Sequence, residues 1–317
     1  MPLIKILLPL PLVLGLLVGC GGVDTVDDDA PPAASDAAAE FPVSVVSGED
    51  GADTEITVER EPASIVSLSP SATEMLWAVG AADQVVAVDD QSDYPEDVPS
   101  TELSGHEPNV EAILEREPDL VITASDQGDL VAALERVHVP TLVLPSATDL
   151  DEAYSQILRV GAATGHAEEA ADLVDVMRSD IEEALADAPD AEGVTYFHEL
   201  TPDLYTASGE TFIGEIYGLF GLTNIADRAG KGDEYPQLSS EYVVSADPDL
   251  VFLADGECCG VQAPDVADRP GWERMAAVEE GQVHVVNEDI VSRWGPRVVD
   301  FVRIISDILS ERGADRP

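Results

Sequence analysis

The sequence predicts an α/β protein built as two similar lobes, each with a mainly parallel sheet flanked by helices, and joined by one long helix. Short apolar strands alternate with helical patterns along most of the chain, which favours parallel sheets covered on both faces. Two short segments recur in the same order in the two halves. Between the halves, residues 167–188 form one continuous helical pattern that would span roughly 30 Å.

The joining helix is predicted from the spacing of its apolar residues. Its mostly apolar face recurs at steps of three and four: Ala171, Val174, Arg178, Ile181 and Leu185. Glu168 and Glu169 near its start suit the helix dipole, and Pro189 ends it. We therefore expect a single strut between the lobes.

The internal repeat is the strongest sign of two lobes. Two pairs of segments match: EMLWAVG at 74–80 with EIYGLFG at 215–221, and EPDLV at 117–121 with DPDLV at 247–251. In each half a glutamate, Glu111 or Glu241, stands seven residues before the proline of the second segment. Two similar lobes leave a cleft between them, which is the default place for a ligand.

The charge balance is extreme. The 317 residues include 64 acidic and 15 basic side chains, a formal net charge of −49, and only Lys5 and Lys231 are lysines. Such self-repulsion opposes compaction at ordinary ionic strength, whereas molar salt shortens the Debye length to about 3 Å and removes most of it. We expect a halophilic protein; the alternative is an acidic mesophilic protein with a disordered tail. The same charge argues against nucleic acid as a partner.

Residues 1–19 form an expected targeting segment. Lys5 is its only charge, and residues 6–18 are an apolar run too short for a comfortable membrane span. The segment ends in LVGC, which resembles a lipoprotein signal with Cys20 as the lipidated new N-terminus; an ordinary cleaved signal is the alternative. Residues 20–57 contain no Lys or Arg and are expected to be a disordered acidic tether. The chain would then be anchored at the extracellular face of the cell membrane without spanning it.

Lobe one is expected at residues 58–148. Its predicted strands cover 65–68, 85–88, 120–123 and 141–144, and its predicted helices cover 72–79, 110–116 and 129–137. Ser71 or Thr73 is expected to cap the first helix. Residues 149–190 are the linking region, with a helix at 150–164 before the strut.

Lobe two is expected at residues 191–313 and repeats the plan. Its predicted strands cover 194–198, 250–253 and 283–286, and its predicted helices cover 211–220 and 298–309. The last helix closes the fold.

Several stretches carry a resemblance to a known family. In lobe one these are IVSLSPSATE at 65–74, SDYP at 92–95, PNVEAI at 108–113 and PDLV at 118–121. They look like the solute-binding proteins of cobalamin and ferric-siderophore importers, and the resemblance runs from about residue 59 to 312. Within that superfamily the pattern is most similar to the cobalamin-binding component, through YPQLSSE at 235–241 and RWGPR at 293–297. Gln91 departs from it, because the cobalamin binder has an aromatic contact there.

The resemblance implies a transport receptor that performs no chemistry and needs no cofactor. It would capture cobalamin in the cleft and deliver it to a dimeric ABC permease with its ATPase subunits. Glu111 and Glu241 would dock against permease arginines; the alternative is that both are ordinary surface acids. A ferric siderophore or haem is the alternative cargo. Because siderophores are often anionic and the cleft offers few cations, Lys231, Arg293 and Arg297, the sequence favours a neutral or cationic corrinoid.

Ligand contacts are expected from loops at the carboxyl ends of the strands. The candidates are Gln91, Tyr94, His106, Tyr205, Tyr235, Asp289, Arg293 and Trp294. His106 is also a possible metal ligand. Several candidates have a structural alternative: a turn for Tyr94, a polar loop residue for His106, and a core aromatic for Trp294. Arg293 and Arg297 would either meet an anionic ligand group or form internal ion pairs.

Two features remain. Cys258 and Cys259 are adjacent and would form a strained disulfide ring, bind a metal or stay as thiols; their spacing fits no zinc pattern. The chain has no GxSxG, no HExxH and no phosphate-binding glycine loop, and its five histidines are scattered singly. We therefore predict that it is not an enzyme and has no metal site of its own.

Overall fold

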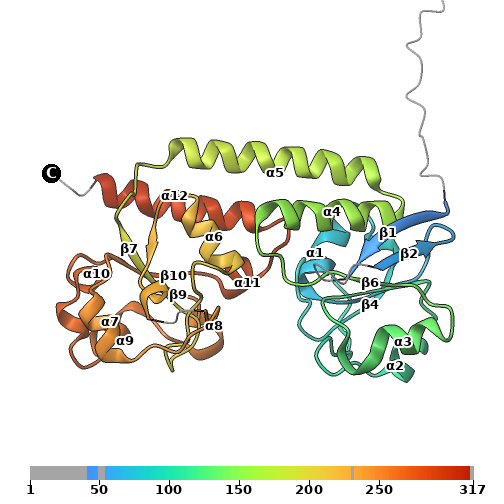
Figure 1. The fold of residues 1–317 in the computed structure, drawn as a ribbon, viewed down its shortest axis with the longest axis horizontal. Helices are drawn as coiled ribbons and strands as arrows, with labels where there is room; N and C mark the ends of the chain where they lie inside the picture. The colour runs from blue at the N-terminus through green and yellow to red at the C-terminus, as the bar shows by residue number, and fades with distance from the viewer. Residues whose placement is uncertain (1–40, 49–53, 230–231, 315–317) are drawn as a thin grey trace, which may run out of the picture. The chain divides into compact units, whose positions relative to one another are not determined.

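The computed structural model has two α/β lobes packed against the same long helices (Figure 1). It describes residues 41–48, 54–229 and 232–314. The predicted fold class is confirmed, and the observed elements begin and end within a few residues of the predicted ones.

Lobe one contains a four-stranded parallel sheet. Its strands are β3 (Ile65–Leu68), β4 (Val85–Val88), β5 (Leu120–Thr123) and β6 (Thr141–Val143). They are ordered β4-β3-β5-β6. The helices around it are α1 (Pro70–Ala78), α2 (Val110–Leu114), α3 (Leu130–Glu135) and α4 (Leu150–Thr164). β3 and β5 are buried along their whole length, as expected for central parallel strands.

Lobe two has the same topology. Its strands are β7 (Thr195–Glu199), β8 (Thr223–Asn224), β9 (Leu250–Leu253) and β10 (Val283–Val285), ordered β10-β9-β7-β8 and all parallel. In each lobe the first strand therefore lies between the second and the third. The helices are α6 (Phe212–Gly218), α7 (Ser240–Ala246), α8 (Gly256–Cys259), α9 (Ala263–Ala267), α10 (Ala276–Glu279), α11 (Glu288–Ser292) and α12 (Val298–Ala314). Short 3-10 turns lie at Ala82–Gln84, Gln127–Asp129, Ala226–Arg228 and Trp272–Arg274.

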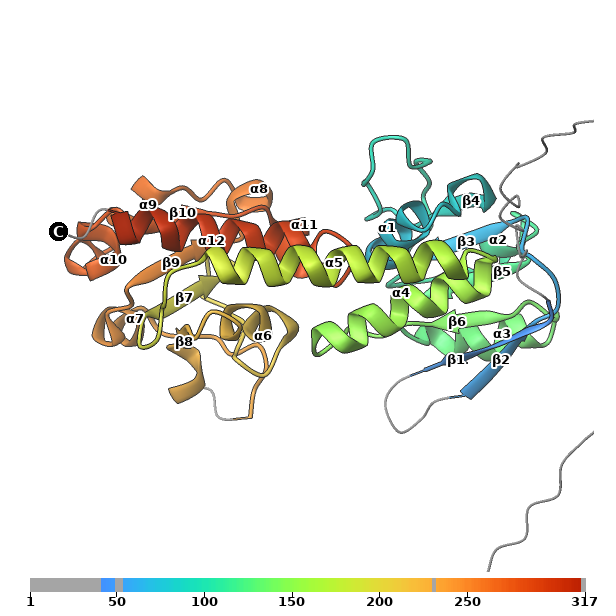
Figure 2. The same cartoon turned by 90° about the horizontal axis from the view of Figure 1, so that it is seen from above.

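The strut is α5 (Ala167–Asp187), and it is packed along its length rather than free-standing. Figures 1 and 2 show it lying beside α4 of lobe one and α12 of lobe two. Its buried face is Ala170, Val174, Met177, Ile181 and Ala184. A Cβ on Gly161 of α4 would lie 2.3 Å from that of Ala170, so the glycine permits this close helix contact.

Two positions of the predicted strut face are wrong, because Ala171 and Arg178 are exposed. Arg178 points outward from α5, where it forms an ion pair with Asp151 (2.8 Å) and stacks over Tyr154. The true buried face is displaced around the helix toward Ala170 and Met177. Small and flexible apolar residues there fit between α4 and α12, and the charged group stays in water.

Two strands precede lobe one, where the sequence suggested a disordered tether. β1 (Val43–Ser47) and β2 (Thr54–Val58) pair antiparallel, with Val45 and Val58 buried. The Ser47 hydroxyl accepts a hydrogen bond from the amide of Val143 (2.8 Å) and fixes β1 beside β6. The expectation of disorder is therefore wrong for both strands, because alternating apolar residues give them one buried face. Two other parts of the expected tether, residues 20–40 and 49–53, lie outside the described residues.

The predicted cap of α1 is also wrong. Ser69, rather than Ser71 or Thr73, is the N-cap, and its hydroxyl accepts from the amide of Ala72 (3.4 Å). Thr73 lies inside the helix, where its buried hydroxyl bonds those of Ser67 and Ser92, each at 2.8 Å. Pro70 at the first helical position fixes the start two residues earlier than the apolar spacing suggested.

Candidate functional site

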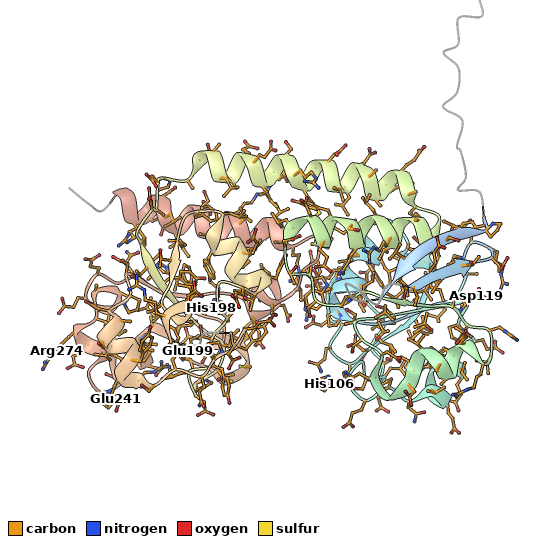
Figure 3. All side chains as sticks on the ribbon, in the orientation of Figure 1. His106, Asp119, His198, Glu199, Glu241 and Arg274 are labelled. Atoms are coloured by element: carbon orange, nitrogen blue, oxygen red, sulfur yellow. The ribbon has the colours of Figure 1, made fainter. Side chains whose placement is uncertain are left out.

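A cavity of about 640 Å³ lies at the carboxyl ends of the lobe-one strands. Its wall includes the ends of three strands or the residues that follow them, at Leu68, Asp89 and Ala124. The loop at residues 104–106 adds His106, and Figure 3 shows this residue on the side of lobe one that faces lobe two. Gly105 holds the loop against β3, because a Cβ there would lie 2.4 Å from the carbonyl oxygen of Leu68.

The opposite wall of this first cavity comes from α11 and the segment that follows it. Arg293 in that segment is buried, and its guanidinium donates to Glu74 (3.1 Å), Asp93 (3.0 Å), Asp289 (2.6 Å) and the carbonyl of Gln91 (3.1 Å). This segment therefore crosses to lobe one and is fastened there.

Arg297 completes the ion cluster. It donates to both oxygens of Glu74, at 3.0 and 2.6 Å, and its guanidinium stacks 4.1 Å from the ring centre of Tyr94. Burial lowers the pKa of Arg297, but the hydrogen bond to Glu74 and the nearby negative charges, chiefly Glu74 itself, together raise it above its usual value. The two arginines thus form internal ion pairs, which was one of the two alternatives for them.

A second cavity of about 460 Å³ opens between the lobes and shares Ala124 and Ser125 with the first. Lobe one contributes residues 145–148 and Glu152 of α4, and lobe two contributes Glu210, Phe212 and Tyr235 among others. Together the two cavities form a cleft bounded by both lobes, which we call the inter-lobe cleft.

A third cavity of about 250 Å³ lies wholly within lobe two. Its walls include Thr195 and Thr223, at the amino ends of β7 and β8, so it is away from the inter-lobe cleft.

Six of the eight predicted ligand residues line the inter-lobe cleft. Gln91, His106, Asp289, Arg293 and Trp294 line the first cavity and Tyr235 lines the second. Tyr94 and Tyr205 line neither cavity. Tyr94 lies under Arg297, and Tyr205 forms an antiparallel bridge with Gln237.

Trp294 is a core aromatic, one of the two roles considered for it, and it also lines the first cavity. Its indole N–H donates to Gln156 Oε1 (3.1 Å) and its ring packs on the core, while one side lines the cavity. The hydrogen bond fixes the plane of the ring, so its cavity side is a rigid apolar surface.

Several cleft residues were not among the predicted ones. They are Ser125, Ser146, Thr148, Glu152, Glu210, Phe212 and Glu234. The first three follow β5 and β6, so the rule that ligands meet the carboxyl ends of parallel strands would have found them. No spacing in the sequence indicates that Glu210 and Glu234 share one cavity.

Glu111 and Glu241 occupy the same position in duplicated helices. Asn109 caps α2 and Ser239 caps α7, and each glutamate is the second helical residue, with its side chain exposed. From residues 111–120 to 241–250 the pattern of buried and exposed residues agrees at every position but one. Figure 1 shows α2 and α7 on the edges of their lobes away from α5, and Figure 3 shows Glu241 on that edge.

Buried charges lie at the carboxyl ends of β7 and β9. Glu199 receives two hydrogen bonds from Arg269, at 2.5 and 2.6 Å, and is fully buried. Asp255 is buried beside it with both carboxyl oxygens unpaired among the described residues, and burial together with Glu199 raises its pKa to about 7. Burial lowers the pKa of the neighbouring His198 to about 3.

Cys258 and Cys259 lie in α8 as exposed free thiols. Among the described residues, no group of three or more His, Cys, Asp or Glu side chains is placed to hold a metal ion. In the same part of the chain no helix has both the length and the apolar character needed to cross a membrane. Cys20 lies outside the described residues.

The chain is similar to a known protein family and to several transport proteins. The periplasmic binding protein family matches residues 65–290. The substrate-binding lipoprotein YvrC of Bacillus subtilis, an uncharacterized ABC transporter component, is 32% identical over 303 residues, 92% of each chain. A cobalamin-binding protein of Halobacterium salinarum is 33% identical over 281 residues, 84% of this chain and 73% of the relative. The crystal structure of the vitamin B12-binding protein BtuF of Vibrio cholerae has a TM-score of 0.67 and 26% identity, and the match covers 80% of this chain and 98% of that one.

Proposed function

Because the chain belongs to the periplasmic binding protein family, we propose that it captures a corrinoid of the cobalamin type in the inter-lobe cleft and delivers it to a dimeric permease. The coarser role follows from the family itself: the chain is a substrate-binding protein of an ABC transporter, and it binds cargo rather than using a cofactor. The cargo and the delivery step are the proposal.

The observation that carries the proposal is the inter-lobe cleft in a chain similar to cobalamin binders. Its two cavities, about 640 and 460 Å³, meet at Ala124 and Ser125. Such a space suits a large macrocycle better than a single sugar or amino acid. Trp294 and Phe212 offer apolar surface, and the serines and threonines offer hydrogen-bond partners for peripheral amides.

Docking on the permease would use Glu111 and Glu241. Their matched positions on α2 and α7 place one carboxylate on each lobe, as a partner with two-fold symmetry requires. Charged pairs at such an interface contribute mainly orientation and association rate. In molar salt, short contacts would matter more than long-range attraction.

Anchoring would use a lipid on Cys20, with the residues after it as a spacer. The lipoprotein name of the Bacillus subtilis relative supports this. The receptor would then work at the extracellular face of the cell membrane.

The cargo is tested by calorimetric titration of residues 38–317, which form one compact unit. Cyanocobalamin, haem and a ferric siderophore are titrated separately in 2 M KCl. Micromolar or tighter binding of cyanocobalamin, with much weaker binding of the other two, is expected. Tight binding of haem or the siderophore without cyanocobalamin would assign the alternative cargo.

Docking is tested by reversing both glutamates, Glu111→Arg and Glu241→Arg, in cells that depend on the importer. Uptake should fall at least tenfold while cyanocobalamin affinity stays the same. The matched control is Glu168→Arg with Glu169→Arg on α5, which changes the net charge equally on another face. Normal uptake by the first variant would refute the docking role.

A further inference from the structure

Among the described residues, the inter-lobe cleft carries negative charge without a free positive partner. The carboxylates lining it are Asp89, Asp90, Glu152, Glu210, Glu234, Glu288 and Asp289. Arg293 is the only lysine or arginine among the lining residues of the described part of the chain. Lys231 lies outside the described residues.

Arg293 is not available to cargo. Its guanidinium already makes four hydrogen bonds, three of them to carboxylates, and its side chain is only 10% exposed. Drawing it toward a ligand anion would leave the buried Glu74 short of one of its partners, which costs several kcal/mol in comparable sites.

Glu210 and Glu234 are held together at the second cavity by a short backbone ribbon. The amide of Ser208 donates to the carbonyl of Glu234 (2.8 Å), and the amide of Thr206 donates to that of Pro236 (3.1 Å). Both carboxylates line the cavity and are exposed. Neither forms an ion pair with a basic side chain in the described ranges.

Tyr235 is affected by the charge of Glu234. The pKa of its hydroxyl is raised, first by burial and then by the carboxylate of Glu234. By contrast Glu152, on the opposite wall, accepts hydrogen bonds from the amide (2.9 Å) and hydroxyl (3.2 Å) of Thr148, so its charge is partly satisfied. Within the described ranges, the unpaired charge of the second cavity is therefore concentrated on Glu210 and Glu234.

We propose that the inter-lobe cleft selects cargo by charge, admitting neutral and cationic metal chelates and disfavouring anionic ones, with Glu210 and Glu234 as the specificity-determining pair. An anionic group entering the cleft loses hydration and meets like charge, whereas a cationic or amide group finds acceptors. Applied to a corrinoid, the charge selection deepens the proposed function and rests on it.

Three cyanocobalamin derivatives test the filter with the metal and its axial ligands unchanged. One peripheral amide is left intact, hydrolysed to a carboxylate, or extended with an aminoethyl group, which gives relative charges of 0, −1 and +1. The affinity for residues 38–317 in 0.15 M KCl should rise about threefold to fivefold with each step toward positive charge, as expected for exposed pairs. The difference in affinity between the three derivatives should shrink in 2 M KCl, because salt screens the charges. Circular dichroism checks that the protein is folded at both salt concentrations.

In the variant Glu210→Gln with Glu234→Gln, the affinities for the three derivatives should differ by less than about twofold, and the affinity for the neutral derivative should not fall. The control Glu168→Gln with Glu169→Gln removes the same net charge from α5 and should leave the differences in affinity between the derivatives unchanged. An equal loss in both variants would show that the net charge of the protein, and not the cleft, is responsible. Equal affinity of all three derivatives for the unaltered protein would overturn the proposal.

A second pair of probes separates this inference from the corrinoid assignment. A cationic ferric trihydroxamate and a trianionic ferric tricatecholate are titrated in the same way. If no corrinoid binds but the cationic chelate does, the cargo proposal fails and the charge filter stands. If the anionic chelate binds as tightly as the cationic one, or none of the five compounds binds, the charge filter fails.

Discussion

The two lobes agree at the positions that build the sheet. Glu117 follows α2 and Asp247 follows α7, and both residues have a positive φ, 51° and 49°. A proline comes directly after each of them. The next residues, Asp119 and Asp249, both accept a hydrogen bond at 3.0 Å from a backbone amide that precedes or starts the first strand of their lobe. The repeated EPDLV and DPDLV segments are thus structural devices that tie the third strand to the first.

The lobes differ at the first residue of the other repeated segment, which is buried in lobe one and exposed in lobe two. Glu74 and Glu215 are the equivalent first residues of the other repeated segment. Glu74 is buried and receives Arg293 and Arg297, whereas Glu215 is exposed. The segment that follows α11 covers lobe one at Glu74. The duplicated residues therefore explain the shared fold, and the unequal ones mark where the lobes are joined.

The largest expected loss of stability comes from removing the buried glutamate of lobe one, compared with its exposed equivalent in lobe two. Glu74→Ala should lower the free energy of unfolding by about 3 kcal/mol, because it leaves two largely buried arginines short of their partner. Glu215→Ala should change it by less than about 0.5 kcal/mol. Urea unfolding of both variants measures this. Similar values for the two would mean that the ion cluster does not hold the joint.

Much of this architecture was predictable from the sequence. α4 was predicted with its observed bounds, and β5 and β9 were also correct, because buried parallel strands are short apolar runs between turn residues. The β1–β2 hairpin was missed because its acidic surroundings hide one apolar face. The cap of α1 was missed because three hydroxyl residues compete there and the proline decides.

The cleft was less predictable than the fold. Gln91 and His106 were found because loops after parallel strands meet at one edge. Tyr94 and Tyr205 line neither cavity, because aromatic residues in loops also serve as packing surfaces, and their role as ligand contacts stays a prediction. The pairing of Arg293 with Glu74 joins residues 219 positions apart, and no local pattern encodes such a contact.

A second test compares the two tying aspartates. Asp249→Ala should cost about 2 kcal/mol, since Asp249 also pairs with Arg312, whose side chain is only 6% exposed. Asp119→Ala should cost about 1 kcal/mol, because its arginine partner, Arg60, is 73% exposed. Thermal unfolding of both variants gives the order. A reversed order would place the stronger tie in lobe one.

The third test concerns the buried carboxyl of lobe two. Asp255 has a pKa raised from 3.8 to about 7, so the folded state retains a proton that the unfolded state releases from about pH 4 upward. Its contribution to stability therefore falls as the pH rises from about 4 to 7 and then levels off. Asp255→Asn should leave stability unchanged at pH 4 and raise it by about 1.5 kcal/mol at pH 8. Urea unfolding at both pH values measures the difference, and equal effects at the two values would contradict it.

The smallest effects are expected where α5 touches the two lobes alike. Arg178 pairs with Asp151 of α4, and Arg303 of α12 pairs with Asp180 of α5, each at 2.8 Å between groups that are at least one-third exposed or close to it. Arg178→Met and Arg303→Met should each cost about 0.5 kcal/mol in 0.15 M KCl and less in 2 M KCl, because exposed pairs are weak and screened by salt. Unfolding midpoints in both salts measure this. A loss above about 2 kcal/mol at either site would show that a surface ion pair, and not the apolar face of α5, fastens the strut to that lobe.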